Sequence, residues 1–167
     1  ARGLGILQAA PETTVPILIA MLDDTSFYIQ LTACHAVARF GSNATPALPK
    51  LVQLLKNPRL TSGIGAIFRS IGPAGRPILL ELLSDEEAQL RIAAVRIFAQ
   101  VEGTNVSHIT ALIPLLHDSS LEVRCVVASA VADAPAVPDI WLQPFIEALT
   151  TESNSIVRLH ICEALQQ

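Results

Sequence analysis

Aromatic side chains are scarce in this sequence: its 167 residues include only five Phe, one Trp and one Tyr, although hydrophobic residues make up 51%. A core of this composition has to be built from Ala, Val, Leu and Ile. Small aliphatic side chains let helix axes approach closely, and Ala loses no side-chain entropy in a helix. The scarcity of aromatic rings therefore favours a helical fold over a sheet.

Basic clusters and long apolar runs are missing too. The formal net charge is −4, and the nine Arg and two Lys residues are scattered singly. Binding to a nucleic-acid backbone normally depends on clustered Lys and Arg, so nucleic acid is not an expected partner. Apolar runs such as residues 15–22 are far shorter than the roughly 20 residues of a membrane-spanning helix. We therefore expect no membrane partner.

Sequence patterns for disulfides, metals and catalysis are also lacking. Cys34, Cys125 and Cys162 form no CxxC pair, and their apolar neighbours indicate buried, reduced thiols in a cytoplasmic protein. None of the four histidines has a Cys, His or Asp at the i+4 spacing of a metal site on a helix. There is no GxSxG, Walker-type or GxGxxG motif. The sequence thus predicts no enzyme, no metal site and no cofactor.

What the sequence does contain is an internal repeat. Five apolar pairs end at intervals of 33, 28, 33 and 33 residues, and their second members are Leu22, Leu55, Leu83, Leu116 and Leu149. A short polar break follows each pair, and a second apolar-periodic stretch follows each break. Each repeating unit is therefore a helical hairpin, and an array of such hairpins is typical of a solenoid.

Two of the hairpins carry a more specific pattern. The runs Leu83-Ser-Asp85 to Leu90-Arg91 and Leu116-His-Asp118 to Val123-Arg124 resemble the HEAT repeat, in which a first helix ends in Leu-Leu-x-Asp and a second opens with Val-Arg. The short repeat is similar to that of phycobilisome lyase-like HEAT proteins. The resemblance covers nearly the whole chain. It implies an all-α fold, namely a right-handed α-solenoid superhelix of about five HEAT-type hairpins.

The repeat predicts where the helices lie. First (A) helices are expected near residues 14–23, 45–56, 74–84, 106–117 and 138–150, and second (B) helices near 26–40, 59–71, 86–101, 119–132 and 154–166. The domain is expected to be one solenoid over residues 1–167, with repeats at about 11–41, 42–72, 73–103, 104–135 and 136–167. Residues 1–10 resemble the tail of a preceding repeat, with a short helix at 2–10. The five Leu residues that close the apolar pairs should be buried equivalents.

The family resemblance also implies a structural ladder, in which a turn carboxylate of one repeat pairs with an arginine of its neighbour and fixes the stacking. Its expected members are Asp85, Arg91, Asp118, Arg124 and Arg158. In the first two repeats the arginine position holds Gln30 and Gly63. Gly63 and Gly65 predict a frayed or abbreviated second B helix, because Gly costs about 1 kcal/mol per helical position, or a place where a partner approaches the backbone.

Stacked B helices line the concave face of a solenoid. Counted from the ladder position, offsets +3, +4 and +7 are expected in the core and offsets +2, +5 and +9 on the outside. The resulting outward stripe is Thr32, His35, Arg39, Phe68, Arg96, Gln100, Ser129, Asp133, His160 and Glu163. The stripe runs from basic to acidic, which favours a peptide or helical partner of mixed charge over a polyanion.

These features indicate a non-catalytic scaffold that binds a protein or peptide on its concave B-helix face or at its open ends. The resemblance leaves a bilin lyase-like, chromophore-handling protein as a second hypothesis. A nucleic-acid-binding solenoid is the third, although Trp141 is the only Trp and lies on an A helix. Apolar terminal helices, with Leu4, Leu7, Ile156 and Leu165, predict self-association or continuation of the solenoid through the terminal repeats.

Overall fold

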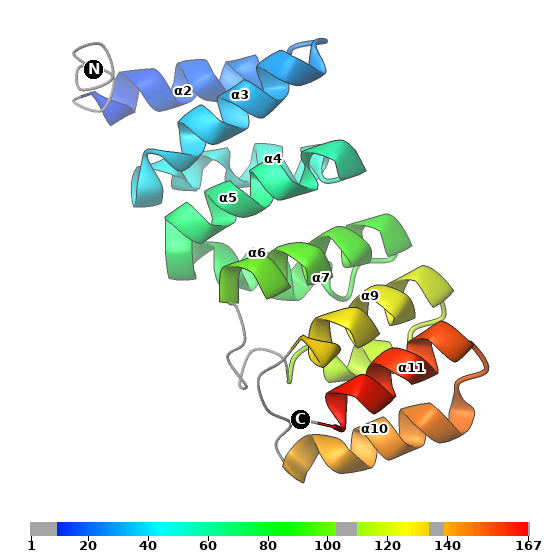
Figure 1. Cartoon of the computed structure of the whole chain (residues 1–167). Helices are drawn as coiled ribbons and strands as arrows, with labels where there is room; N and C mark the ends of the chain where they lie inside the picture. The colour runs from blue at the N-terminus through cyan, green and yellow to red at the C-terminus, as the bar shows by residue number, and fades with distance from the viewer. Residues whose placement is uncertain (1–9, 103–109, 134–138, 167) are drawn as a thin grey trace. The chain divides into compact units, whose positions relative to one another are not determined.

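The computed structural model describes residues 10–102, 110–133 and 139–166, and these residues form helices, turns and no strand. The fold is an all-α solenoid, and within each compact unit of the chain the helical hairpins pack side by side (Figure 1). The elements in chain order are α2 (Pro11–Met21), α3 (Phe27–Ala38), η1 (Gly41–Ala47), α4 (Leu48–Leu54), η2 (Pro58–Leu60), α5 (Thr61–Ile71), η3 (Gly72–Gly75), α6 (Arg76–Leu82), α7 (Ala88–Glu102), η4 (Ile113–His117), α9 (Leu121–Ala132), α10 (Asp139–Thr151) and α11 (Ser155–Ala164).

The chain divides into two compact units, Ala1–Leu79 (unit 1) and Leu80–Gln167 (unit 2), with the boundary inside α6. A single solenoid over the whole chain stays a prediction. The short helix expected at residues 2–10 falls on residues outside the described part, apart from residue 10, and so do Leu4 and Leu7.

Unit 1 is built around the contact between its two B helices, α3 and α5. The glycine at 63 makes this contact close: a Cβ atom there would lie 3.1 Å from Leu31 Cδ1 and 3.2 Å from Cys34 Cβ. Helix α5 is regular over 11 residues, so the expected fraying is wrong, but the helix begins at Thr61, two residues after its expected start. Gly63 and Gly65 are both buried, and close packing against neighbouring side chains offsets their low helix propensity.

Proline explains why several A segments contain tighter 3₁₀ turns. Pro46 lies in η1, Pro73 in η3 and Pro114 in η4. Proline lacks the N–H group that an α-helical hydrogen bond needs, and it is best tolerated in a first turn. The A helices α4 and α6, with 7 residues each, are therefore shorter than the B helices α5 and α7 that follow them, with 11 and 15 residues.

Unit 2 stacks α7, α9 and α11 in series, and α10 packs against α11 and η4 (Figure 1). Its largest buried side chain is Trp141, whose Nε1 donates a hydrogen bond to Thr110 Oγ1 at 3.0 Å. The ring of Phe145 lies 6.1 Å from that of Trp141. Apart from Phe98, the rest of the core consists of Ala, Val, Leu and Ile, as expected from the scarcity of aromatic residues.

The repeat-closing leucines are buried in four of five cases. Leu22, Leu55, Leu83 and Leu116 are 0–5% exposed. The expectation is wrong for Leu149, which is half-buried. The buried side of α10 passes through Trp141, Phe145 and Ala148, so Ala148 takes the core position and Leu149 lies at the edge of the packed face.

No helix in the described ranges has the length and apolar character needed to span a membrane.

Candidate functional site

Arg91 forms the first step of the ladder in unit 2. It lies in the first turn of α7 and is only 9% exposed. Its Nε and Nη2 donate to the two carboxylate oxygens of Asp118 at 2.7 and 2.8 Å, and its Nη1 donates to the carbonyls of Asp85 and Glu86 at 2.7 and 2.9 Å. A planar guanidinium suits this bidentate geometry. Arg91 thus joins the turn before its own helix to the turn of the next hairpin.

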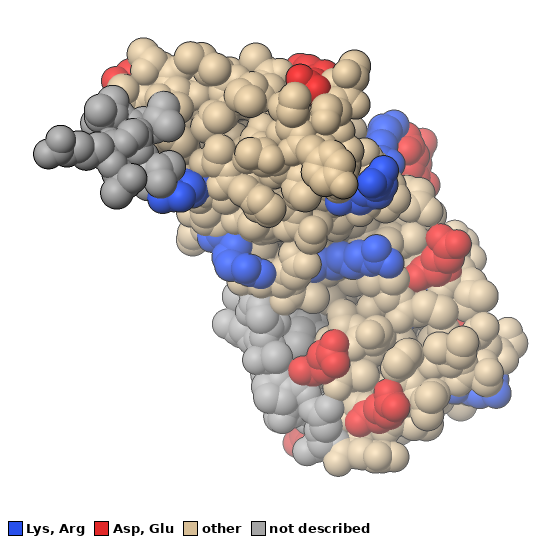
Figure 2. Space-filling view, turned by 45° about the horizontal axis from the view of Figure 1, so that its top comes forward, with Lys and Arg blue, Asp and Glu red and all other residues tan. Residues whose placement is uncertain are grey.

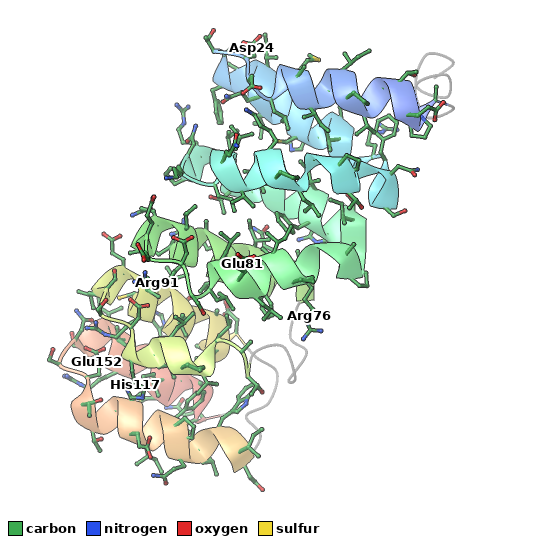
Figure 3. The ribbon with its side chains drawn as sticks, turned by 180° about the vertical axis from the view of Figure 1, so that it is seen from behind. Asp24, Arg76, Glu81, Arg91, His117 and Glu152 are labelled. Carbon is green, nitrogen blue, oxygen red and sulfur yellow. The ribbon has the colours of Figure 1, made fainter. Side chains whose placement is uncertain are left out.

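Arg124 repeats this arrangement one hairpin later. Its Nε and Nη2 donate to Glu152 at 2.5 and 3.3 Å, and its Nη1 donates to the Asp118 carbonyl at 2.9 Å. Figure 3 shows Arg91 and Glu152 on the turn side of unit 2. Glu152 was not among the expected ladder residues. Its signal in the sequence is its spacing, because it precedes Arg158 by six residues as Asp118 precedes Arg124.

Arg158 forms only the carbonyl contacts of this arrangement. Its Nη1 donates to the carbonyls of Glu152 and Ser153 at 3.0 and 2.7 Å. Within the described residues no carboxylate pairs with its other edge.

The ladder carboxylates also hold their own turns. Asp118 Oδ1 accepts the Ser120 amide at 2.8 Å, and Glu152 Oε1 accepts the Asn154 amide at 2.7 Å. Burial opposes ionisation of Asp118, but hydrogen bonds from Arg91 and from the Ser120 amide outweigh it and lower the pKa of Asp118. The hydrogen bond from Arg124, opposed by burial, lowers the pKa of Glu152. Both carboxylates are therefore ionised at neutral pH, and both take part in the ion pairs between successive hairpins.

The expected outward stripe is largely at the surface. Thr32, His35, Arg39, Arg96, Gln100, Asp133 and Glu163 are exposed, and Ser129 and His160 are half-buried. Some of these residues contact their own helix: Thr32 Oγ1 donates to the Tyr28 carbonyl at 2.7 Å, and His160 Nδ1 lies 2.9 Å from Glu163 Oε2. Members of the stripe therefore project from B helices of both units.

Phe68 is the exception, since it is 1% exposed and belongs to the core. The sequence count for the second repeat is wrong by one residue. Counted from Ile64, the core offsets +3, +4 and +7 fall on buried residues 67, 68 and 71, and offset +5 falls on exposed Arg69. The ring of Phe68 packs so closely on Gly75 that a Cβ there would lie 2.7 Å from Phe68 Cδ1. This contact places Phe68 on the buried side of α5.

Charge is divided unevenly between the two units. Unit 1 contains seven Lys and Arg against three Asp and Glu, a net charge of +4, whereas unit 2 contains four against twelve, a net charge of −8. In the face shown in Figure 2 both signs are spread out, with no wide patch of one sign. The asymmetry is thus established for the totals of the two units.

The cavities among the described residues include two that are smaller than a typical ligand site. One has a volume of about 230 Å³ and is lined by Pro11, Glu12, Val15, Pro16, Asn43 and Pro46. The other, about 200 Å³, lies over the second ladder step and is lined by Leu116, His117, Asp118, Arg124, Thr151, Glu152 and Ser153. Small-molecule sites usually enclose about 300–1,000 Å³. In the described ranges, no group of three or more His, Cys, Asp or Glu side chains is placed to hold a metal ion.

A comparison with a solved structure supports the all-α solenoid fold. A designed armadillo repeat protein in complex with the peptide (KR)4 is similar over 96% of this chain and 84% of its own, with 20% identity and a TM-score of 0.50. Two engineered proteins solved by a structural genomics consortium each match 90% of this chain and 77% or 79% of their own, with 22% or 20% identity and TM-scores of 0.48 and 0.49.

No curated protein sequence matches the chain. The profile of HEAT repeats matches residues 76–166, which is more than half of the chain and includes every step of the ladder. The chain therefore belongs to the HEAT repeat family.

Proposed function

We propose that the protein is a non-catalytic scaffold that binds a peptide or helical segment of mixed charge along the outward sides of its B helices. The observation that carries this proposal is that some charged residues form the contacts between hairpins, whereas others are exposed to solvent. The stacking contacts use Arg91 and Arg124 with their carboxylates. By contrast, Arg39 directly after α3, Asp133 directly after α9 and Glu163 on α11 are exposed.

The designed armadillo repeat protein with the same fold supports the proposal, because it is in complex with a charged peptide, (KR)4. A solenoid presents evenly spaced side chains from successive helices, and an extended peptide can meet several of them at once. The acidic B-helix residues of unit 2 would attract the basic part of a partner, and the basic residues of unit 1 its acidic part. Among the described residues, no observation favours chromophore handling or nucleic-acid binding over this function.

Binding of fluorescein-labelled model peptides to the full chain tests the proposal. We expect (KR)4 joined through a flexible linker to (DE)4 to bind at least about tenfold more tightly than (KR)4 or (DE)4 alone, because two weak contacts on one molecule reinforce each other. The double variant Asp133→Lys, Glu163→Lys should lose the (KR)4 contribution. Fluorescence anisotropy at several salt concentrations measures both effects.

The matched control is Glu81→Lys, Glu147→Lys, which makes the same change in net charge at exposed positions on A helices. Equal loss of binding in the control and in the stripe variant would contradict the proposal, since it would show that only the net charge of the protein matters.

A further inference from the structure

The position five residues after the ladder position, offset +5, lies at the surface of the B helices. It is exposed on α3, α5, α7 and α11 and half-buried on α9. Helices α5 and α7 are preceded and followed by other helices of the chain, so this exposure belongs to the repeat itself. The residues at offset +5 are, in chain order, His35, Arg69, Arg96, Ser129 and Glu163. The two B helices of unit 1 therefore carry His and Arg where the last two B helices of unit 2 carry Ser and Glu.

Acidic residues are absent from the part of the sequence that contains α3 and α5. Residues 25–80 include no Asp or Glu, but they include six Lys and Arg residues. Two of the six have contacts that account for them, because Lys50 forms an ion pair and Arg59 stacks on an aromatic ring. Arg39 and Arg69 are both exposed. The B helices of unit 1 thus present cations and carry no carboxylate of their own.

The C-terminal ends of α3 and α5 lie side by side (Figure 1). A Cβ atom on Gly41 would lie 3.7 Å from the carbonyl oxygen of Ser70. Arg39 is two residues before Gly41 and Arg69 is one residue before Ser70, so both arginines belong to this end of unit 1. His35 lies four residues before Arg39, which places the two on the same side of α3. We call His35, Arg39 and Arg69 the anion face.

Helix dipoles do not account for these cations by themselves. A cation near the C-terminal end of a helix is favoured by the partial negative charge there. The residue of unit 2 that corresponds to Arg39 is Asp133, directly after α9, where the same effect is unfavourable. The sign of the charge at this position therefore differs between the units although the helix dipole does not.

We propose that the anion face binds an acidic peptide segment, whose carboxylates accept hydrogen bonds from the guanidinium groups of Arg39 and Arg69 and from the His35 ring. This inference rests on the proposed function and states where the acidic part of the partner binds. A guanidinium can donate two parallel hydrogen bonds to one carboxylate, and an imidazole has an N–H to donate in either charge state. Carboxylates a few residues apart in a peptide can therefore meet successive donors of the face.

A short acidic peptide fits the anion face better than a nucleic acid does. Proteins that bind a nucleic-acid backbone tightly typically neutralise about 6–10 phosphates. The anion face offers three donor side chains, in a chain whose formal net charge is −4. A few carboxylates match three donors, whereas a long polyanion would extend beyond them.

Charge reversal on the anion face tests the proposal. Fluorescein-labelled (DE)4 should bind the full chain at low salt. The double variant Arg39→Glu, Arg69→Glu should weaken this binding roughly 10- to 100-fold, because two attractive contacts become repulsive. His35→Ala should weaken it only about two- to tenfold, since one hydrogen bond is lost. Fluorescence anisotropy measures the affinities, and circular dichroism confirms that each variant is folded.

The matched control is Lys56→Glu, Arg59→Glu, which makes the same change in net charge in the same unit. Both control residues are exposed and precede α5, so they lie at the opposite end of that 11-residue helix, about 16 Å from the anion face. The control should bind (DE)4 within about threefold of the unchanged protein. Absence of (DE)4 binding, or equal losses in the control and the anion-face variant, overturns the proposal. Equally tight binding of an oligothymidylate with the same number of charges, lost in the same variant, also overturns it, because the site would then bind any polyanion.

The peptide that joins (KR)4 to (DE)4 separates this inference from the proposed function. If the joined peptide binds more tightly than either part but Arg39→Glu, Arg69→Glu leaves its affinity unchanged, the acidic part binds elsewhere and only this inference fails. If (DE)4 binding is lost in that variant but the joined peptide binds no more tightly than (DE)4, the anion face is supported and the mixed-charge partner is wrong.

Discussion

The two units build the same repeat by different means. In unit 2, two bidentate arginine–carboxylate pairs link successive hairpins. In unit 1 the ladder position of α3 is Gln30, which donates a single hydrogen bond to the Leu22 carbonyl at 3.2 Å. There the hairpins are held by the close approach of α3 and α5 at Gly63, by an ion pair between Lys50 and Asp23 and by Arg59 stacked 4.1 Å from the Phe27 ring.

This difference shows that the repeat determines which helices pack against each other. The residues that stabilise the packing can differ from one hairpin to the next. Charge-assisted pairs depend on pH and on both partners being present. Contacts at a glycine depend on volume and respond to a single methyl group. The two units should therefore fail under different perturbations, and three experiments can separate them.

Acid should produce the largest difference between the units. The pKa values of Asp118 and Glu152 are lowered in the folded protein. Their contribution to stability is therefore complete above the ordinary carboxylate pKa of about 4 and is lost as the pH falls through the lowered values. Hydrogen-exchange protection of α9 and α11 should fall before that of α3 and α5 as the pH is lowered from about 6 to about 2.5.

The variant Asp118→Asn, Glu152→Gln is the control for the acid experiment, because it removes both titrating groups. It should be less stable near neutral pH and should show a flatter dependence of the free energy of unfolding on pH. An unchanged pH dependence would mean that other carboxylates cause the acid sensitivity.

Loss of one ladder arginine should produce the next largest effect. Arg91→Ala leaves the Asp118 carboxylate, whose side chain is 6% exposed, without its cation. Breaking a buried ion pair typically costs about 3–5 kcal/mol. The matched change in unit 1, Gln30→Ala, removes one neutral hydrogen bond and should cost about 1 kcal/mol. Urea unfolding, with α7 and α3 followed separately by hydrogen exchange, measures both. Equal losses would remove the distinction between the units.

The sequence predicted the fold well because the repeat signal is redundant. Five apolar pairs and their polar breaks locate the hairpins, and an error at one repeat leaves the others in place. Leu149 shows the limit of this signal, because its neighbour Ala148 takes the core position. A pair of adjacent apolar residues does not indicate which of the two is buried. In the second repeat Leu55 is buried as expected, and the error of one residue lies in the count from Leu55 to the ladder position.

The candidate surface was harder to predict, because it depends on register more strongly than the fold does. A shift of one residue turns a helix position by about 100°, which moves Phe68 into the core and Arg69 to the surface. Nothing in the sequence indicated that Gly63 and Gly75 face side chains of their own unit. Glu152, by contrast, could have been found from its six-residue spacing to Arg158 alone.

Two glycines of unit 1 give the smallest effects and the sharpest test of packing by volume. Gly75→Ala places a Cβ 2.7 Å from Phe68 Cδ1, and the ring of Phe68 is buried on all sides, so the free energy of unfolding should fall by about 1–3 kcal/mol. Gly63→Ala meets looser contacts, 3.1 Å to a Leu31 methyl group and 3.2 Å to Cys34 Cβ. Alanine gains about 1 kcal/mol of helix propensity there, which offsets the crowding, so the net change should stay within about 1 kcal/mol. Urea midpoints of the two variants rank them. If Gly63→Ala is the more damaging change, the α3–α5 contact is tighter than the α5 contact with Gly75, and unit 1 is held chiefly at Gly63.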